Sequence, residues 1–200
     1  MDRLTPSVPS HRYNCRTMEP NTLILFAHPA LEKSRVNRRL VQAVQDLPGV
    51  TFHDLYQLYP DFDIDVAREQ RLLTAHDKVV LQFPFYWYST PALVKEWEDL
   101  VLEHGWAYGH DGKALKGKSL TGAISTGGGA RTYAKSGSNR HEMREFLFPL
   151  EQTALLCGMR WLQPFIIHGT HALDDAAIAV QAEAYRQFIV GLRDGQGERP

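Results

Sequence analysis

Short apolar runs alternate with segments of helical periodicity along nearly the whole chain, and this alternation limits the fold more than any other feature. The runs predict five strands, at residues 22–27, 50–54, 78–83, 119–125 and 161–168. The segments between and after them predict helices at residues 35–45, 66–75, 91–102, 142–156 and 174–192. Strands that alternate with helices form a parallel sheet covered on both faces. We therefore predict a doubly wound α/β fold with strand order 2-1-3-4-5.

In such a sheet, ligands bind outside the carboxyl ends of the strands, at the point where the strand order reverses. The loops that follow the first, third and fourth strands meet there. We therefore expect functional residues in these three loops.

The length of 200 residues fits one domain, which we place at residues 21–200. Residues 1–20 contain three prolines and three arginines and predict a flexible extension. No apolar stretch reaches the roughly 20 residues that span a bilayer. A net charge of -1 argues against nucleic acid as a partner, because that binding needs a basic surface. Two cysteines do not form a disulfide framework, which suits a reducing compartment.

The loop after the first strand contains His28 and leads into a helix through Ser34, Arg35 and Asn37. A helix N-terminus presents free N–H groups and suits a phosphate. Ser34 is a natural N-cap, and Arg35 and Asn37 add donors. The alternative is that Ser34 only caps the helix and that His28 is only a residue at a strand end. The loop lacks the glycines of a dinucleotide fingerprint or a P-loop.

The loop after the third strand holds four aromatic residues between Pro84 and Pro91, namely Phe85, Tyr86, Trp87 and Tyr88. Loops seldom carry so much large apolar surface. A flat conjugated ligand would explain it, because rings contact its face while the backbone bonds its polar edge. The alternative is a loop packed into a subunit interface, and both roles are compatible.

The fourth strand leads into Thr126 and three consecutive glycines, Gly127, Gly128 and Gly129. Glycines let the backbone come close to a ligand and direct N–H groups at it. At the pyrimidine end of a flavin, such donors would stabilise the negative charge of the reduced ring. A triple glycine taken alone is more often a flexible turn.

Two clusters of residues that could bind a metal ion lack the full pattern of a metal site, so we predict none. His168 and His171 lie three positions apart and lack a nearby third ligand. The aspartates at positions 61, 63 and 65 lack the glycine and the closing glutamate of a calcium loop.

Several blocks together resemble the NAD(P)H:quinone oxidoreductase family. They are residues 27–29 (Ala-His-Pro), 82–88 (Gln-Phe-Pro-Phe-Tyr-Trp-Tyr), 95–97 (Lys-Glu-Trp) and 126–128 (Thr-Gly-Gly). Residues 55–62 (Leu-Tyr-Gln-Leu-Tyr-Pro-Asp-Phe) and 104–110 (His-Gly-Trp-Ala-Tyr-Gly-His) are most similar to one bacterial branch. That branch consists of the ancillary proteins of glutathione-gated potassium efflux systems. The similarity runs from about residue 21 to residue 193.

The resemblance implies a flavodoxin-like homodimer with a flavin at the dimer interface. It assigns the flavin phosphate to His28, Ser34, Arg35 and Asn37. It assigns the isoalloxazine ring to Pro84, Phe85, Trp87 and Tyr88, and the pyrimidine edge to Thr126, Gly127 and Gly128. It implies FMN as the cofactor, with FAD as the alternative.

The resemblance also implies catalytic positions. Tyr108 and His110 match positions that reach into the partner subunit's pocket. The family places a Tyr and, six positions on, a His that supply or relay the proton for the reduced quinone. Tyr133 matches the Tyr, but the nearest following His is His141, eight positions on. Tyr133 alone or with water would also serve.

The function implied is two-electron reduction of quinones by NAD(P)H in a ping-pong cycle, in the cytoplasm. A regulatory subunit that docks on a potassium efflux transporter, at the cytoplasmic face of the inner membrane, is a second reading compatible with the first. An electron carrier of the flavodoxin type fits less well, because such carriers are strongly acidic and have a hydroxyl-and-glycine phosphate loop.

Overall fold

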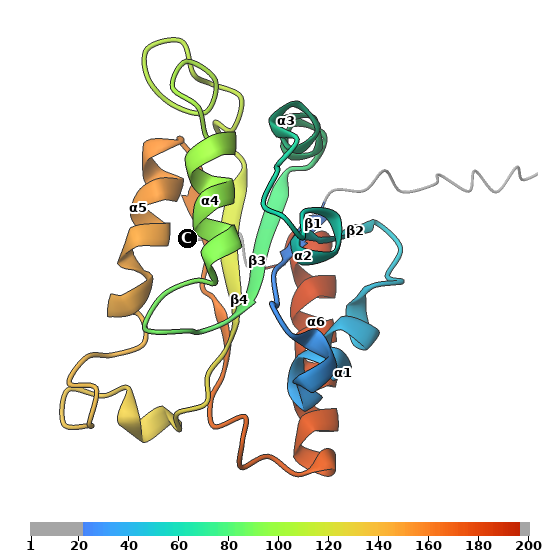
Figure 1. Cartoon of the computed structure of the whole chain (residues 1–200), viewed down its shortest axis with the longest axis vertical. Helices are drawn as coiled ribbons and strands as arrows, with labels where there is room; N and C mark the ends of the chain where they lie inside the picture. Colours follow the sequence, from blue (N-terminus) through green and yellow to red (C-terminus); the bar gives the residue numbers. More distant parts are fainter. Residues whose placement is uncertain (1–21, 197–200) are drawn as a thin grey trace, which may run out of the picture.

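The computed structural model describes residues 22–196, and a parallel sheet forms their centre (Figure 1). The strands are β1 (Thr22–Phe26), β2 (Val50–Asp54), β3 (Lys78–Pro84), β4 (Ser119–Ser125), β5 (Arg160–Trp161) and β6 (Phe165–Ile167). Their order is β2-β1-β3-β4-β5, and β6 also pairs with β4. All of these pairs are parallel. The predicted strand order is confirmed. The extension predicted at residues 1–20 lies outside the described residues.

The last predicted strand is divided in two, so the prediction of one strand over residues 161–168 is wrong. β5 pairs with the start of β4, and β6 pairs with its end. Pro164 lies between them, and proline has no N–H for a sheet hydrogen bond. The Thr121 hydroxyl bridges the break by donating to the carbonyl oxygens of Leu162 (3.3 Å) and Gln163 (3.1 Å).

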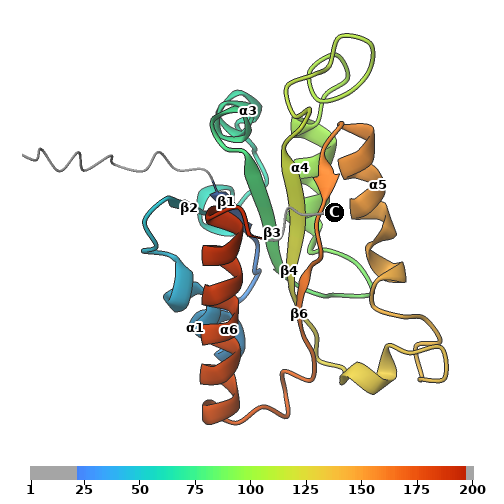
Figure 2. The same ribbon diagram turned by 180° about the vertical axis from the view of Figure 1, so that it is seen from behind.

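Helices cover both faces of the sheet, as predicted (Figures 1 and 2). The helices are α1 (Arg35–Val44), α2 (Leu55–Leu58), α3 (Val66–Ala75), α4 (Ala92–Val101), α5 (Phe148–Leu156) and α6 (Asp175–Arg193). α1 and α6 lie on one face, and α4 and α5 lie on the other. Along β1, Leu23 and Leu25 pack with the α4 and α5 side, whereas Ile24 and Phe26 pack with the α1 and α6 side. The strands are apolar throughout because both faces are buried.

Two helical features differ from the prediction. The short helix α2 directly follows β2 and was not predicted; the Asp54 side chain caps it by accepting from the Gln57 N–H (3.2 Å). The helix predicted from residue 142 begins at Phe148, after a 3-10 turn at Glu145–Leu147. Pro149 lies in its first turn, where the missing N–H breaks no helical hydrogen bond.

A buried carboxylate, Glu69, links α3 to β2 and α4 by hydrogen bonds. Glu69 in α3 has no exposed surface, and it accepts hydrogen bonds from three side chains. The donors are His53 Nε2 (2.8 Å), the Tyr59 hydroxyl (2.6 Å) and Trp97 Nε1 (2.9 Å). Burial raises the pKa of Glu69, but these hydrogen bonds outweigh it, and the pKa lies below its ordinary value. Glu69 is therefore ionised, and it joins β2, α3 and α4.

Candidate functional site

His28 follows β1 as a buried side chain with a defined tautomer. Its Nδ1 accepts a hydrogen bond from the Ala30 backbone N–H (3.1 Å). Burial lowers the pKa of His28, against the opposing charge of Glu32, so the ring is neutral near pH 7. A neutral ring whose Nδ1 accepts must carry its proton on Nε2. His28 therefore offers one N–H donor at the carboxyl end of the sheet.

Ser34 and Asn37 tie the start of α1 to the end of β4. The Ser34 hydroxyl oxygen caps α1 by accepting from the Asn37 backbone N–H (3.2 Å) and from Asn37 Nδ2 (3.0 Å). Asn37 Nδ2 also donates to the Ser125 hydroxyl (3.0 Å). Asn37 is buried. These two side chains therefore build the helix N-terminus that the sequence predicts for a phosphate.

Arg35 is directed away from these groups, toward α6. Its Nη2 lies 2.6 Å from Asp175 Oδ1, and its Nη1 donates to the Leu173 carbonyl (3.3 Å). The guanidinium holds the pKa of Asp175 below its ordinary value. Both side chains are largely exposed, so this pair is of the weak, exchangeable kind. Arg35 would have to leave Asp175 to contact a phosphate at the α1 N-terminus.

The aromatic loop after β3 is a tight two-residue turn. The Tyr86 N–H donates to the Ser89 carbonyl (3.1 Å) and the Ser89 N–H donates to the Tyr86 carbonyl (2.9 Å). Trp87 and Tyr88 between them have φ values of 49° and 64°. This left-handed conformation favours glycine and costs other residues about 1–2 kcal/mol each. Trp87 is nevertheless 93% exposed. The turn presents a large ring to solvent at the expense of backbone strain, and such strain is concentrated at functional sites.

Phe85 anchors this turn in the core. It is buried, and its ring lies 6.0 Å from the ring of Tyr133 and 5.7 Å from the ring of Phe146. Pro84 ends β3 opposite Ser125, the last residue of β4. The turn after β3 therefore lies beside the loop after β4.

In the loop after β4, neighbouring side chains leave no room for a residue larger than glycine at two positions. A Cβ atom on Gly127 would lie 2.8 Å from His171 Nε2. A Cβ atom on Gly128 would lie 2.8 Å from Thr132 Oγ1 and 3.1 Å from Tyr133 Cε2. A Cβ atom on Gly129 would meet nothing within 4 Å. Because Gly127 and Gly128 have no side chains, the rings of His171 and Tyr133 can lie against the backbone of this loop.

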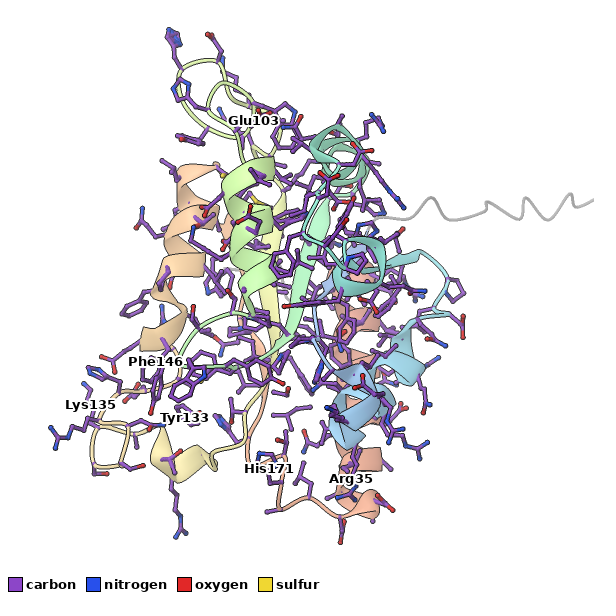
Figure 3. The ribbon with its side chains drawn as sticks, viewed as in Figure 1. Arg35, Glu103, Tyr133, Lys135, Phe146 and His171 are labelled. Atoms are coloured by element: carbon purple, nitrogen blue, oxygen red, sulfur yellow. The ribbon has the colours of Figure 1, made fainter. Side chains whose placement is uncertain are left out.

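These segments enclose a pocket of about 530 Å³, within the range of ligand sites. Its lining comes from the aromatic turn, the glycine loop and the segments that follow them: Phe85, Tyr86, Trp87, Tyr88, Gly127, Gly128, Thr132, Tyr133, Ser138, Asn139 and His171. The His28 ring lies 6.3 Å from the ring of Tyr86, so the loop after β1 adjoins the pocket. Figure 3 shows Tyr133, Phe146 and His171 at this end of the sheet, with Glu103 at the opposite end. The three loops meet where the strand order reverses.

A model of the flavodoxin-like fold family matches residues 20–189 of the chain. The chain belongs to this family. It is 49% identical over 173 residues to KefF of Enterobacter sp. (strain 638), a glutathione-regulated potassium-efflux system ancillary protein, covering 86% of this chain and 97% of that protein. The predicted resemblance to these ancillary proteins is confirmed.

Solved structures have the same flavodoxin-like architecture. General stress protein 14 of Treponema denticola, in complex with FMN, has a TM-score of 0.80 at 40% identity and covers 86% of this chain and 99% of that chain. An NADPH-quinone reductase from P. pentosaceus has a TM-score of 0.77 at 34% identity and covers 84% and 96%. A structure described as a tryptophan halogenase from Streptomycin violaceusniger reaches 0.82 at 42% identity and covers 84% and 98%. Backbone likeness alone does not decide the reaction.

Six residues that the sequence predicted for the site line the pocket of this flavodoxin-like chain: Phe85, Trp87, Tyr88, Gly127, Gly128 and Tyr133. Thr126 is buried, and its hydroxyl donates to the Gly128 carbonyl oxygen (2.8 Å). His28, Ser34, Asn37 and Pro84 lie in the adjoining loops and strand end. Their roles toward a ligand stay predictions.

Three predicted catalytic residues do not line the pocket. Tyr108 lines a groove of about 370 Å³ between α4 and α5. His110 has a side chain that is 93% exposed. Both belong to the loop between α4 and β4, at the opposite end of the sheet (Figure 3). The His141 side chain is 60% exposed and lies 3.5 Å from Glu145 Oε2.

Several pocket residues were not predicted from the sequence. Asn139 stands six positions after Tyr133, where the resemblance implies a His. His171 was considered only as a metal ligand, yet its ring packs over Gly127. Asn139 could have been predicted from its spacing of six residues from Tyr133. The residues next to His171 in the sequence give no indication that it lines the pocket. Thr132 and Ser138 also line it.

Within residues 22–196, His, Cys, Asp and Glu side chains form no group of three or more that could hold a metal ion. None of the helices in this range combines the length and the apolar character of a membrane-spanning segment.

Proposed function

We propose that the chain is an FMN-dependent oxidoreductase that reduces quinones with electrons from NAD(P)H. The observation that carries the proposal is the pocket where Trp87 and Gly128 face the same space. Part of its lining is aromatic and part is the glycine backbone of residues 127 and 128, a combination that suits a flat ring system with a polar edge. The FMN complex of the Treponema denticola relative and the NADPH-quinone reductase from P. pentosaceus support it.

The residues present fit a bound flavin mononucleotide. The phosphate would lie at the N-terminus of α1, near the Nε2–H group of His28 and the side chains of Ser34 and Asn37. Arg35 would add a charge if it left Asp175. Phosphate binding is therefore expected to break the Arg35–Asp175 pair.

The remaining groups of the pocket would hold the ring system. Pro84, Phe85, Trp87 and Tyr88 would contact its face, and the segment 126–128 would bond its pyrimidine edge. A bound flavin would supply the redox chemistry, the transfer of two electrons from NAD(P)H to a quinone. The protein orients the reactants, supplies donors and excludes water. FAD is the alternative cofactor.

The test is a titration of the purified protein with FMN and with FAD, followed by visible absorption and by flavin fluorescence. We expect saturable FMN binding and menadione-dependent oxidation of NADH or NADPH by the loaded protein. If the loaded protein oxidises neither nucleotide with menadione, the proposed reaction is wrong.

We also propose that two copies form the active unit. Large apolar side chains are exposed on α4 and α5, including Leu100, Phe148, Leu155 and Leu156. A partner that covers this face would explain them, because monomeric proteins rarely leave a large apolar patch in water. Tyr108 and His110 would then contribute to the partner's pocket, as the resemblance implies.

A second function is favoured by the identity of 49% to KefF. We propose that the chain also binds a potassium efflux transporter at the cytoplasmic face of the inner membrane. Co-purification with a transporter encoded nearby would test this. A Gly128→Ala variant that loses flavin but still activates efflux would separate binding from redox chemistry.

A further inference from the structure

A hollow of about 400 Å³ lies between α1 and α6, and four residues of α1 line it. Their positions follow the spacing i, i+3, i+4 and i+7, which places side chains along one side of a helix. Asp175 and Ile178 of α6 complete the lining. The four α1 residues form what we call the arginine stripe: Arg35, Arg38, Arg39 and Gln42.

Positive charge exceeds negative charge in this hollow. Three guanidinium groups face one carboxylate, that of Asp175. Arg35 Nη2 lies 2.6 Å from Asp175 Oδ1. The pKa of Asp175 is lowered first by this contact with Arg35 and further by the charge of Arg39. One carboxylate therefore interacts with two of the three arginines and cannot neutralise the stripe.

The other two arginines of the stripe contact uncharged groups. Arg38 and Arg39 are exposed. Arg38 Nε donates to the Ser34 carbonyl oxygen (3.2 Å), and Arg39 Nη1 lies 3.5 Å from Gln42 Oε1. These contacts orient the two guanidinium groups along the helix without neutralising them. Because a guanidinium group has five N–H donors, both arginines keep donors for a ligand.

The stability of α1 does not explain the stripe. The first turn of α1 begins with Arg35 and contains no acidic residue. The N-terminal end of a helix carries partial positive charge, so acidic residues stabilise it and basic residues do not. α6 follows this rule, with Asp174 as its N-cap and Asp175 in its first turn. A sequence that departs from the rule in α1 is typical of a functional surface.

The shape of the stripe favours an acidic protein segment as its ligand. Its four positions extend about 10 Å along the helix axis, which exceeds the size of one phosphate group. Carboxylates two residues apart in an extended chain are about 7 Å apart, so two of them match this length. Anionic membranes are bound by larger clusters, of roughly four to eight basic residues. Arginine is also the side chain that best matches a carboxylate, as Arg35 does with Asp175.

The arginine stripe lies away from the proposed dimer interface. α1 and α6 cover one face of the sheet, and α4 and α5 cover the other (Figures 1 and 2). Arg35 lies beside the start of α6 in Figure 3. A dimer that forms through α4 and α5 would therefore leave the stripe accessible to another protein.

We propose that the arginine stripe binds an acidic segment of a partner protein. The proposal deepens the second proposed function, and it rests on that function in taking the potassium efflux transporter as the partner. Carboxylates of the segment pair with Arg38 and Arg39, which need not leave any acidic partner. Because the charges are exposed, binding weakens as the salt concentration rises.

The first test measures binding of a fluorescein-labelled oligoglutamate peptide to the full-length protein by fluorescence anisotropy. We expect saturable binding that weakens with added salt. Arg38→Glu/Arg39→Glu is expected to bind the peptide about tenfold more weakly, because two attractions become repulsions. The matched control is Arg68→Glu/Arg71→Glu, which makes the same charge change at two exposed arginines of α3. The control should bind the peptide as the unaltered protein does.

Asp175→Asn is expected to change the affinity in the opposite direction. The Asp175 side chain is 93% exposed, and its charge repels an acidic segment. Removing this charge should tighten peptide binding by about threefold. A variant that only disturbed the fold would not bind more tightly, so the two opposite changes together identify the hollow as the binding site.

Three results would overturn the proposal. The first is an unaltered protein that does not bind the peptide, or an equal loss in the two double variants. The second is displacement of the peptide by inorganic pyrophosphate at the peptide's own concentration, which would show a site for small anions. The third is tighter binding to phosphatidylglycerol vesicles than to the peptide, lost in Arg38→Glu/Arg39→Glu, which would show a membrane-binding surface.

Co-purification with the transporter separates this inference from the proposed function. If only Arg38→Glu/Arg39→Glu fails to co-purify with the transporter, both are supported. If both double variants co-purify as the unaltered protein does, the transporter binds elsewhere and the inference is wrong, whereas the proposed function stands. If the unaltered protein does not co-purify, the proposed function is wrong, and the peptide titration still decides whether the stripe binds acidic segments.

Discussion

Trp87 is almost fully exposed and has a left-handed backbone. Substitutions at this position should therefore distinguish the stability cost of the backbone strain from the contribution of the ring to ligand binding. Trp87→Gly removes the ring and relieves the strain, whereas Trp87→Ala removes only the ring. Because the ring is 93% exposed, neither variant loses much core packing. We expect Trp87→Gly to be more stable than Trp87→Ala by about 1 kcal/mol. Both should bind FMN more weakly, by about 0.5–1.5 kcal/mol for the lost ring contact.

Urea unfolding of the flavin-free proteins and FMN titration check this pair. Equal stability of the two variants would show that the turn carries no strain. Unchanged FMN affinity in both would remove Trp87 from the proposed site.

Gly128 offers a second test at the residue scale. In Gly128→Ala, the new methyl group would meet Thr132 at 2.8 Å and the Tyr133 ring at 3.1 Å, so Tyr133 must move. We expect a loss of about 1–3 kcal/mol of stability, typical of overpacking, together with weaker FMN binding. Gly129→Ala is the control, because its Cβ has open space and its φ of -70° suits any residue. Thermal unfolding and FMN titration of both variants would check this, and similar losses in both would contradict the geometry.

At the scale of secondary-structure elements, Glu69 joins β2, α3 and α4 through one buried carboxylate. Glu69→Gln keeps the shape but places an amide NH₂ group against hydrogen-bond donors. We expect a loss of about 1–3 kcal/mol, the cost of unsatisfied buried polar groups. Glu183→Gln on α6 is the control, because Glu183 is exposed and its bond from Gln187 (2.7 Å) can persist.

The stability difference between the unaltered protein and Glu69→Gln should decrease as the pH falls. The pKa of Glu69 is below its ordinary value of 4.5, so the folded state favours the ionised carboxylate. The stabilisation from this ionisation is complete above the unfolded pKa, and it is lost as the pH falls through the folded pKa. Urea midpoints of the unaltered protein and Glu69→Gln should therefore converge below about pH 4.5. A constant difference down to acid pH would show that ionisation contributes nothing.

At the scale of the whole molecule, the exposed apolar side chains of α5 predict a dimer. Replacing Phe148 and Leu155 together by glutamate should give monomers, because two charges cannot be buried in an apolar interface without partners. The matched control is Val180→Glu, an exposed apolar residue on α6, on the other face of the sheet.

Light scattering after size-exclusion chromatography measures the outcome. The unaltered protein and Val180→Glu should be dimers. If the unaltered protein is a monomer, Tyr108 and His110 have no partner pocket to enter. If the double variant stays dimeric, another face forms the interface.

The strand order and the place of the pocket could be predicted from the sequence alone. Apolar runs of strand length separated by helical periods allow few topologies, since connections are short and right-handed. That topology brings the loops after β1, β3 and β4 together, so the sequence predicts that Trp87 and Gly128 line one pocket. Caps such as Ser34 and Asp174 are also local, because a cap bonds an N–H three residues away.

The remaining features depend on residues far apart in the chain, and only the tertiary structure decided them. Arg35 binds Asp175, 140 positions on, instead of pointing toward the proposed phosphate site. The His beside Tyr133 is His168, because β6 pairs with the end of β4 and places residue 168 against Thr126. Along the sequence, the nearest His after Tyr133 is His141, eight positions on. Periodicity and capping act within a few residues, whereas side-chain partners are chosen by packing across the sheet, which no local pattern contains.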